Sequence, residues 1–149
     1  HILIVTSRYY AHIAAELEAG VVEGLERVGA SYEFLEVPGA FEIPGAIALA
    51  AETGEYDGFA ALGCVIRGET SHYDLICNEV ARGLMDLSLA GVPVAFGVLT
   101  VDNEAQAKVR ADRKQKNKGA EVVAAVLRMI GISYRFQNSS VDEPEGNLN

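Results

Sequence analysis

Four short stretches of the chain are apolar and rich in β-branched residues, and amphipathic segments separate them. These stretches are residues 1–6 (HILIVT), 32–37 (YEFLEV), 58–64 (GFAALGC) and 92–100 (VPVAFGVLT). Such runs predict β-strands, and their nearly continuous apolar character is typical of parallel strands, which are buried on both faces. We therefore expect a central four-stranded sheet that is mostly parallel.

Between the strands, apolar residues recur at every third or fourth position, which is the period of an amphipathic helix. The two clearest sets are Ile13, Leu17, Val21, Leu25 and Val28, and Ile76, Val80, Leu84 and Leu87. Residues 41–52 predict a shorter helix with Pro44 in its first turn, where the missing N–H costs little. Strand and helix thus alternate, which predicts an α/β fold with helices on both faces of the sheet.

The last third of the chain predicts two further helices. Asp102 or Asn103 can cap the first of them, residues 117–119 indicate a break, and residues 120–130 form the second. A chain of 149 residues is the usual size of one domain, which we place at residues 1–136. Residues 137–149 are polar and have little to bury, so we expect a disordered tail.

Composition excludes several classes of partner. The net charge of −9 argues against a nucleic-acid ligand, because binding phosphate backbones requires clustered Lys and Arg, and the basic cluster at residues 110–118 is local. The apolar runs are much shorter than the ~18 residues of a membrane-spanning helix. Cys64 and Cys77 cannot form a disulfide framework, which favours a reducing cytoplasm.

The segments that follow the strands carry the candidate chemistry, because ligands of open α/β sheets bind beyond the carboxyl ends of the strands. These segments are residues 7–12, 38–44, 65–72 and 101–106. Together they supply aromatic and polar side chains that suit an aromatic ligand with polar groups, namely Tyr9, Tyr10, Phe41, Glu42, Arg67, His72 and Asn103.

Residues 68–70 (GET) lie just before the helix that begins near His72. Free N–H groups at a helix N-terminus attract anions, and Gly68 allows close approach of the backbone, so a phosphate or carboxylate site is one interpretation. A plain turn capped by Thr70 or Ser71 is the other. Both interpretations are compatible with this stretch of sequence.

His72 is a candidate proton carrier, because imidazole titrates near neutral pH; a structural or solvated histidine is the alternative. We expect no metal site, because the three histidines and two cysteines lack metal-ligand spacing. The chain has no dinucleotide, P-loop or nucleophile-elbow motif. Cys64 fits an apolar structural role better than that of a nucleophile.

Four motifs in order sharpen this interpretation: VPGAFEIP, ALGCVIRGETSHYD, PVAFGVLTVDNEAQAKVR and NKGAE. With them, the chain resembles the 6,7-dimethyl-8-ribityllumazine synthase family of riboflavin biosynthesis over nearly its whole length. The resemblance implies a flavodoxin-like fold and a transferase that needs no cofactor. It would condense 5-amino-6-(D-ribitylamino)uracil with 3,4-dihydroxy-2-butanone 4-phosphate to give the lumazine, phosphate and water.

The resemblance also implies roles for individual residues. Tyr9 would stack on the pyrimidine, and Val65 and Ile66 would meet the heterocycle through their backbone. His72 would be the general acid and base, and Arg110 would hold the phosphate. The other substrate-binding residues implied are the ribityl-binding segment Ala40, Phe41 and Glu42, the phosphate loop Gly68, Glu69 and Thr70, Phe96 from a neighbouring subunit, and the cation Lys118.

The family assembles as pentamers with active sites at subunit interfaces, so a homo-oligomer is expected, with riboflavin synthase as a candidate partner. Two features depart from the family pattern. Tyr10 replaces a frequent Asn, and residues 111–116 (ADRKQK) lack the Gly-containing kink of many shell-forming members. We expect these six residues to continue the preceding helix, which favours pentamers or decamers over shells. A non-catalytic flavin- or lumazine-binding protein is the alternative function.

Overall fold

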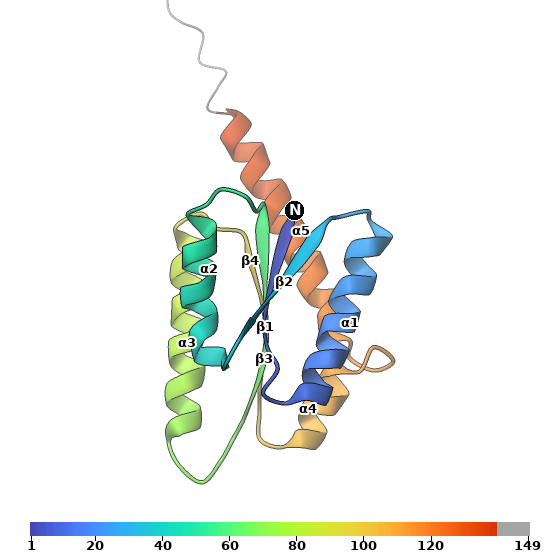
Figure 1. Ribbon diagram of the computed structural model, residues 1–149, viewed down its shortest axis with the longest axis vertical. Coiled ribbons are helices and arrows are strands. Elements are labelled where there is room, and N and C mark those ends of the chain that lie inside the picture. The colour runs from blue at the N-terminus through green and yellow to red at the C-terminus, as the bar shows by residue number, and fades with distance from the viewer. Residues whose placement is uncertain (140–149) are drawn as a thin grey trace, which may run out of the picture.

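The structure is a computed structural model that describes residues 1–139 (Figure 1). Its elements in chain order are β1 (Ile2–Ser7), α1 (Ala11–Arg27), β2 (Tyr32–Val37), the short 3-10 helix η1 (Ala40–Glu42), α2 (Ile43–Ala51), β3 (Gly58–Ile66), α3 (His72–Leu89), β4 (Val94–Val101), α4 (Glu104–Ala111) and α5 (Lys118–Ser139). Of the predicted polar tail, residues 137–139 belong to α5, and residues 140–149 lie outside the described part of the chain.

All four strands are parallel and lie in the order β2-β1-β3-β4. Helices α2 and α3 cover one face of the sheet, and α1, α4 and α5 cover the other (Figure 1). The predicted three-layer α/β/α sandwich of flavodoxin-like type is thereby confirmed. Because the strands are parallel, their carboxyl ends all lie at the lower end of the view in Figure 1.

The central strand β1 shows how the sequence forms two cores. Side chains alternate across a strand, so Ile2 and Ile4 pack against α1 and α5, whereas Leu3 and Val5 pack against α2 and α3. All of these side chains are at most 4% exposed. Burial of one such side chain contributes roughly 1.5–3 kcal/mol, so β1 anchors both layers of helices.

Strand β2 differs from the expectation that every strand is buried on both faces. It is an edge strand, and Phe34 and Leu35 are 41% and 39% exposed. One neighbouring strand and partial helix cover leave most of its side chains accessible. In the single chain this strand therefore exposes the side chains of Phe34 and Leu35 together with the carboxylates of Glu33 and Glu36.

Several element boundaries also differ from the sequence prediction. β3 continues to Ile66 because its ladder with β4 extends to the pair Ile66↔Val101. α1 ends before Val28, which is 59% exposed, because Gly29 adopts a left-handed φ of 70°. Asn103 caps α4: its Oδ1 accepts a hydrogen bond from the N–H of Gln106 at 2.9 Å.

The connection between α4 and α5 is a tight turn, so the predicted continuation of the helix through residues 111–116 is wrong. The Asp112 carboxylate accepts a hydrogen bond from the main-chain N–H of Lys114 at 2.8 Å, and such local bonds compete with helical ones. Asn117 then adopts a left-handed φ of 44°, and its side chain accepts from the N–H of Ala120 at 3.3 Å. These contacts end one helix and begin the next.

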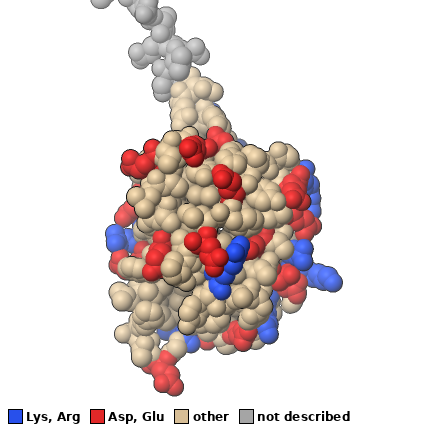
Figure 2. All heavy atoms as spheres, viewed as in Figure 1, with Lys and Arg blue, Asp and Glu red and all other residues tan. Residues whose placement is uncertain are grey.

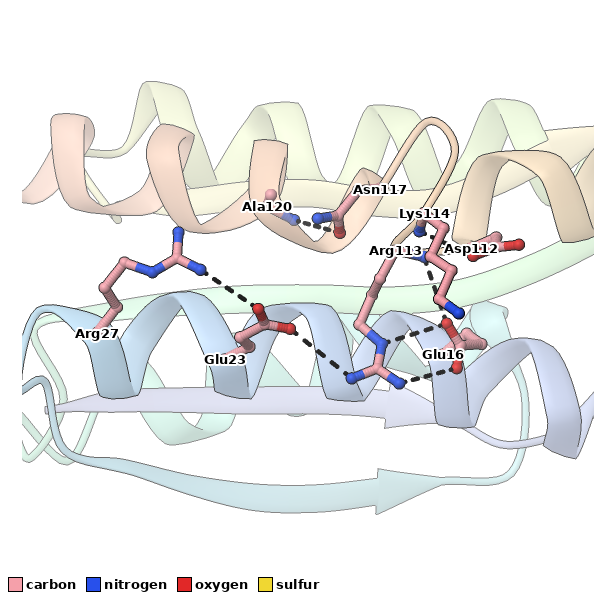
Figure 3. Close-up of polar contacts among 8 residues, drawn as sticks. All are labelled: Glu16, Glu23, Arg27, Asp112, Arg113, Lys114, Asn117 and Ala120. Carbon is pink, nitrogen blue, oxygen red and sulfur yellow. Dashed lines mark hydrogen bonds and ion pairs between the residues drawn. The ribbon is translucent and has the colours of Figure 1, made fainter.

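Arg113 ties this turn to α1 (Figure 3). Its guanidinium lies 3.3 Å from the Glu16 carboxylate and 3.7 Å from that of Glu23. The hydrogen bond from the Arg113 side chain holds the pKa of Glu16 below its ordinary value of 4.5. The contact therefore stabilises the fold above that pH and is lost as the pH falls through the lowered pKa. The linker gives no reason to prefer small assemblies over shells.

The surface carries charges of both signs, and acidic side chains predominate on the face drawn in Figure 2. Within residues 1–139, no helix combines the length and the apolar character that crossing a bilayer requires.

Helices α1 and α5 cross at two glycines, Gly20 and Gly119. A Cβ on Gly119 would lie 2.8 Å from main-chain atoms of Leu17, Gly20 and Val21, which is shorter than real contacts allow. Only glycine permits this separation of the two helices. The crossing places the start of α5 next to the middle of α1.

We predict that Gly119→Ala lowers the free energy of unfolding by at least about 2 kcal/mol, because the added methyl group must separate two backbones. Gly131→Ala on the same helix is the control, since no atom lies within 4 Å of the added Cβ. It should stabilise the fold slightly through helix propensity, by about 0.5–1 kcal/mol. Urea midpoints at one protein concentration test the pair, and equal midpoints would contradict the tight crossing.

Candidate active site

A pocket of about 470 Å³ opens at the carboxyl ends of β1, β2 and β3. Its lining combines strand ends with the segments that follow them: Ser7, Tyr9, Tyr10, Gly39, Ala40, Phe41, Glu42, Cys64, Val65, Ile66, His72 and Ile76. β2 and β3 lie on opposite sides of β1 in the sheet. The loops at the carboxyl ends of these strands therefore lead away from one another and leave a crevice between them.

Three aromatic rings, those of Tyr9, Tyr10 and Phe41, line this pocket. Tyr9 is 77% exposed and Phe41 is 56% exposed, so both rings are open to a ligand. The Tyr10 ring supports Tyr9 in an edge-on contact with centroids 5.0 Å apart. The preceding residue is also held, because Nε of Arg8 donates a hydrogen bond to the Glu18 carboxylate at 2.9 Å. The Tyr9 ring is thus presented from an anchored loop.

Glu42 supplies a carboxylate to the lining of the pocket, and His72 supplies an imidazole. Glu42 ends η1 and directly precedes α2, and His72 is the first residue of α3. Within residues 1–139, neither the Glu42 carboxylate nor the His72 ring has a hydrogen-bond partner in the protein. Both groups are therefore available to a ligand that enters the pocket.

The pocket also contains a thiol. Burial raises the pKa of Cys64 to about 11, with a smaller contribution from Glu104. Because a raised thiol pKa leaves the group protonated at neutral pH, Cys64 is not an activated nucleophile. This agrees with a packing role beside Tyr10 in the core under α1.

Residues 68–71 form the loop between β3 and α3, which projects beyond the sheet in Figure 1. Within residues 1–139, the N–H groups of Glu69 and Thr70 donate to no protein acceptor, whereas the Thr70 hydroxyl accepts from the N–H of His72 at 3.3 Å. Ser71 occupies the N-cap position without a side-chain cap hydrogen bond, so the loop has free donors at the start of an 18-residue helix. That arrangement attracts an anion.

A second depression, of about 260 Å³, lies along the free edge of β4. Phe96, Arg110 and Lys118 are part of its lining. Arg110 donates to the main-chain oxygen of Gln106 at 3.1 Å and, within residues 1–139, has no carboxylate at ion-pair distance. Lys118 lies 2.9 Å from Glu121. The uncompensated charge of Arg110 makes this depression an anion-attracting surface.

The structure therefore divides the residues named from the sequence into two groups. Tyr9, Ala40, Phe41, Glu42, Val65, Ile66 and His72 line the first pocket, with Gly68, Glu69 and Thr70 in the adjoining loop. Phe96, Arg110 and Lys118 line the second depression. The two groups do not share one cavity in a single chain.

Several lining residues were missed by the sequence reasoning. Ile76 carries a signal, because it lies one turn after His72 and therefore faces the same side of α3. Ser7, Gly39 and Cys64 gave no comparable signal, because strand-end and turn residues of this kind are common in any α/β fold. Their place in the site follows from the sheet order.

Comparison with known proteins identifies the family of the chain. The sequence model of the family described as 6,7-dimethyl-8-ribityllumazine synthase matches residues 1–133. The chain is 48% identical over 136 residues to the 6,7-dimethyl-8-ribityllumazine synthase of Sphingopyxis alaskensis, covering 91% of this chain and 96% of that protein. It is 50% identical to that of Novosphingobium aromaticivorans, covering 90% and 96%, and 47% identical to that of Bartonella henselae, covering 91% and 90%. The chain therefore belongs to the 6,7-dimethyl-8-ribityllumazine synthase family.

Proposed function

We propose that this protein is the transferase that condenses 5-amino-6-(D-ribitylamino)uracil with 3,4-dihydroxy-2-butanone 4-phosphate. The products are 6,7-dimethyl-8-ribityllumazine, phosphate and water. The observation that carries the proposal is the pocket at the carboxyl ends of β1 to β3. It joins open aromatic rings, a free carboxylate and a free imidazole in a chain of this family.

The first pocket suits the ribitylaminouracil. The exposed face of Tyr9 stacks on the pyrimidine, and the backbone of Val65 and Ile66 borders the heterocycle from the end of β3. The segment Ala40 to Glu42 receives the ribityl chain, with the Glu42 carboxylate accepting hydrogen bonds from its hydroxyls. A flat heterocycle and a polyol therefore match two adjoining parts of one pocket.

The reaction requires repeated proton transfer, which we assign to His72. The 5-amino group adds to the ketone, and the carbinolamine loses water to give an imine. Loss of the C–H proton beside the imine carbon expels phosphate, and closure of the ring by the ribitylamino nitrogen on the remaining carbonyl carbon releases a second water. These steps move protons at nitrogen and oxygen and, in the loss of phosphate, at carbon, and an imidazole can both donate and accept a proton at neutral pH. The His72 ring is available because no protein group within residues 1–139 binds it.

The phosphate of the second substrate fits the loop before α3. The N–H groups of Glu69 and Thr70 are free to donate hydrogen bonds to an anion. A Cβ added to Gly68 would have no atom within 4 Å, so a ligand can approach the backbone there. Arg110 supplies the charge-assisted hydrogen bonds that a phosphate favours. Lys118 adds a second cation, and Phe96 closes the pocket over the bound substrates.

We further propose that the complete site forms between two copies of the chain in a pentamer-based homo-oligomer. The first pocket and the depression with Phe96, Arg110 and Lys118 are separate in one chain. The two groups of residues therefore meet only if one copy of the chain supplies the first pocket and a second copy supplies the depression. Exposed apolar side chains on α2 and α3 support association: Leu49 and Leu89 are 76% and 80% exposed.

The cellular setting is part of the same proposal. Cys64 and Cys77 are both free thiols, which favours the cytoplasm. Riboflavin synthase, which uses the lumazine product, is the partner that the family resemblance suggests.

The direct test mixes the purified protein with both substrates and follows the fluorescent lumazine above the uncatalysed rate. We expect His72→Ala to lower kcat on the order of 10²-fold without abolishing turnover, because loss of a general acid and base leaves substrate positioning intact. His12→Ala, on the exposed start of α1, is the control and should keep wild-type kcat. Binding of riboflavin without any turnover would favour the non-catalytic alternative.

Arg110→Ala should mainly raise the KM for the phosphorylated substrate, because it removes a charged phosphate ligand. Mixing it with His72→Ala tests whether two copies share each site. In randomly mixed oligomers, about a quarter of the sites receive both intact groups, so activity should recover to about a quarter of wild type. Activity no higher than the average of the two separate variants would show that one chain supplies both residues.

A further inference from the structure

The strongest unassigned feature is a cluster centred on Arg67, the residue that joins β3 to the loop before α3. Its main-chain N–H donates to the oxygen of Val101 at 2.9 Å. Its Nε donates to Asp102 at 3.0 Å, and its Nη1 lies 3.5 Å from Asp74. Its guanidinium carbon lies 4.2 Å from the centroid of the Tyr73 ring. One side chain thus contacts both the start of α3 and the end of β4.

The loop that follows Arg67 has little else to hold it. Residues 67–72 are all exposed, and Gly68 has no atom near its added Cβ, so apolar packing does not order this segment. The loop nevertheless carries the free N–H groups of Glu69 and Thr70 and leads directly into His72. Its geometry therefore depends on contacts made at its two ends.

Arg67 is poorly suited to be a phosphate ligand itself. Two carboxylates, those of Asp74 and Asp102, already compensate its charge, and one face of its guanidinium is turned to Tyr73. Arg110, by contrast, has no carboxylate at ion-pair distance within residues 1–139. The two arginines are thus distinguished by their partners: one is bound by the protein, and the other is open to an anion.

The cluster extends through Tyr73 to β4. The Tyr73 hydroxyl lies close enough to Cys77, one turn further along α3, and to Thr100 on β4 for both side chains to affect its pKa. Thr100 is also part of the lining of the second depression. Residues from α3, β4 and the segment before α4 are therefore joined around one guanidinium.

We propose that Arg67 is a positioning residue that holds the phosphate-binding loop and the start of α3 in their binding-competent geometry. The inference rests on the proposed function, since it gives the loop its phosphate ligand. Arg67 touches no substrate in this role. It fixes the direction of the N–H groups of Glu69 and Thr70 by tying both ends of the loop to β4.

The test compares Arg67→Met, which keeps the length of the side chain, with Arg67→Lys, which keeps the charge but cannot stack flat or bind two carboxylates side by side. Arg82→Met is the matched control. Arg82 also binds two carboxylates, Glu79 and Asp86, but both lie on α3 itself, and it is ten residues (about 15 Å) along the helix from His72.

The measurements are the KM for each substrate and the Kd of inorganic phosphate by calorimetry. We expect Arg67→Met to raise the KM for the phosphorylated substrate and the phosphate Kd by about tenfold, with Arg67→Lys in between. The KM for the pyrimidine should change less than about twofold, a separation that general loss of structure would not produce. Arg82→Met should match the wild type in all three.

Unchanged phosphate affinity in Arg67→Met, or equal increases in both KM values, would overturn the positioning role. If Arg67→Met does not fold, Asp102→Asn replaces it, because it removes the charge that holds Nε while keeping the shape; a wild-type phosphate Kd in that variant would also overturn the role. The two proposals can fail separately. If the wild-type protein shows no turnover but Arg67→Met still raises the phosphate Kd, the proposed function is refuted and the positioning role of Arg67 stands.

Discussion

The parallel pairing of β1 with β2 on one side and β3 on the other is the constraint on which the rest of the structure depends. It directs every strand end, and every segment that follows one, to the same end of the sheet. It also requires helices on both faces, because the alternating side chains of β1 must be buried on each. The pocket is the space that remains where the chain changes direction around β1.

Short hydrogen-bonded clusters then determine where the exposed loops lie. Arg8 with Glu18 anchors the loop that presents Tyr9, Arg67 anchors the loop before α3, and Arg113 anchors the turn between α4 and α5 (Figure 3). Each arginine connects segments far apart in sequence. An isolated exposed ion pair contributes little to stability, so the effect of these clusters is on loop geometry more than on folding free energy.

The candidate residues are divided between two separate depressions on the surface of the single chain. One side offers a shaped, largely uncharged pocket with a carboxylate and an imidazole, and the other offers Arg110 with a depression along the open edge of β4. In the proposed function, neither surface alone is a complete site for the phosphorylated ketone and the heterocycle together. Assembly and catalysis are therefore linked in the proposed function, since the contact that buries the apolar surface also completes the site.

Hydrophobic periodicity alone determined the four strands, the main helices and the parallel three-layer fold, because burial on both faces leaves an unambiguous pattern in residues such as Ile2 to Val5. The motifs identified the family and the candidate residues. The turn at Asp112, the exposure of β2 and the separation of Arg110 from His72 were decided only by the tertiary structure. The physical reason is that each depends on which segments meet in space, and a pattern along the chain records only what each segment buries.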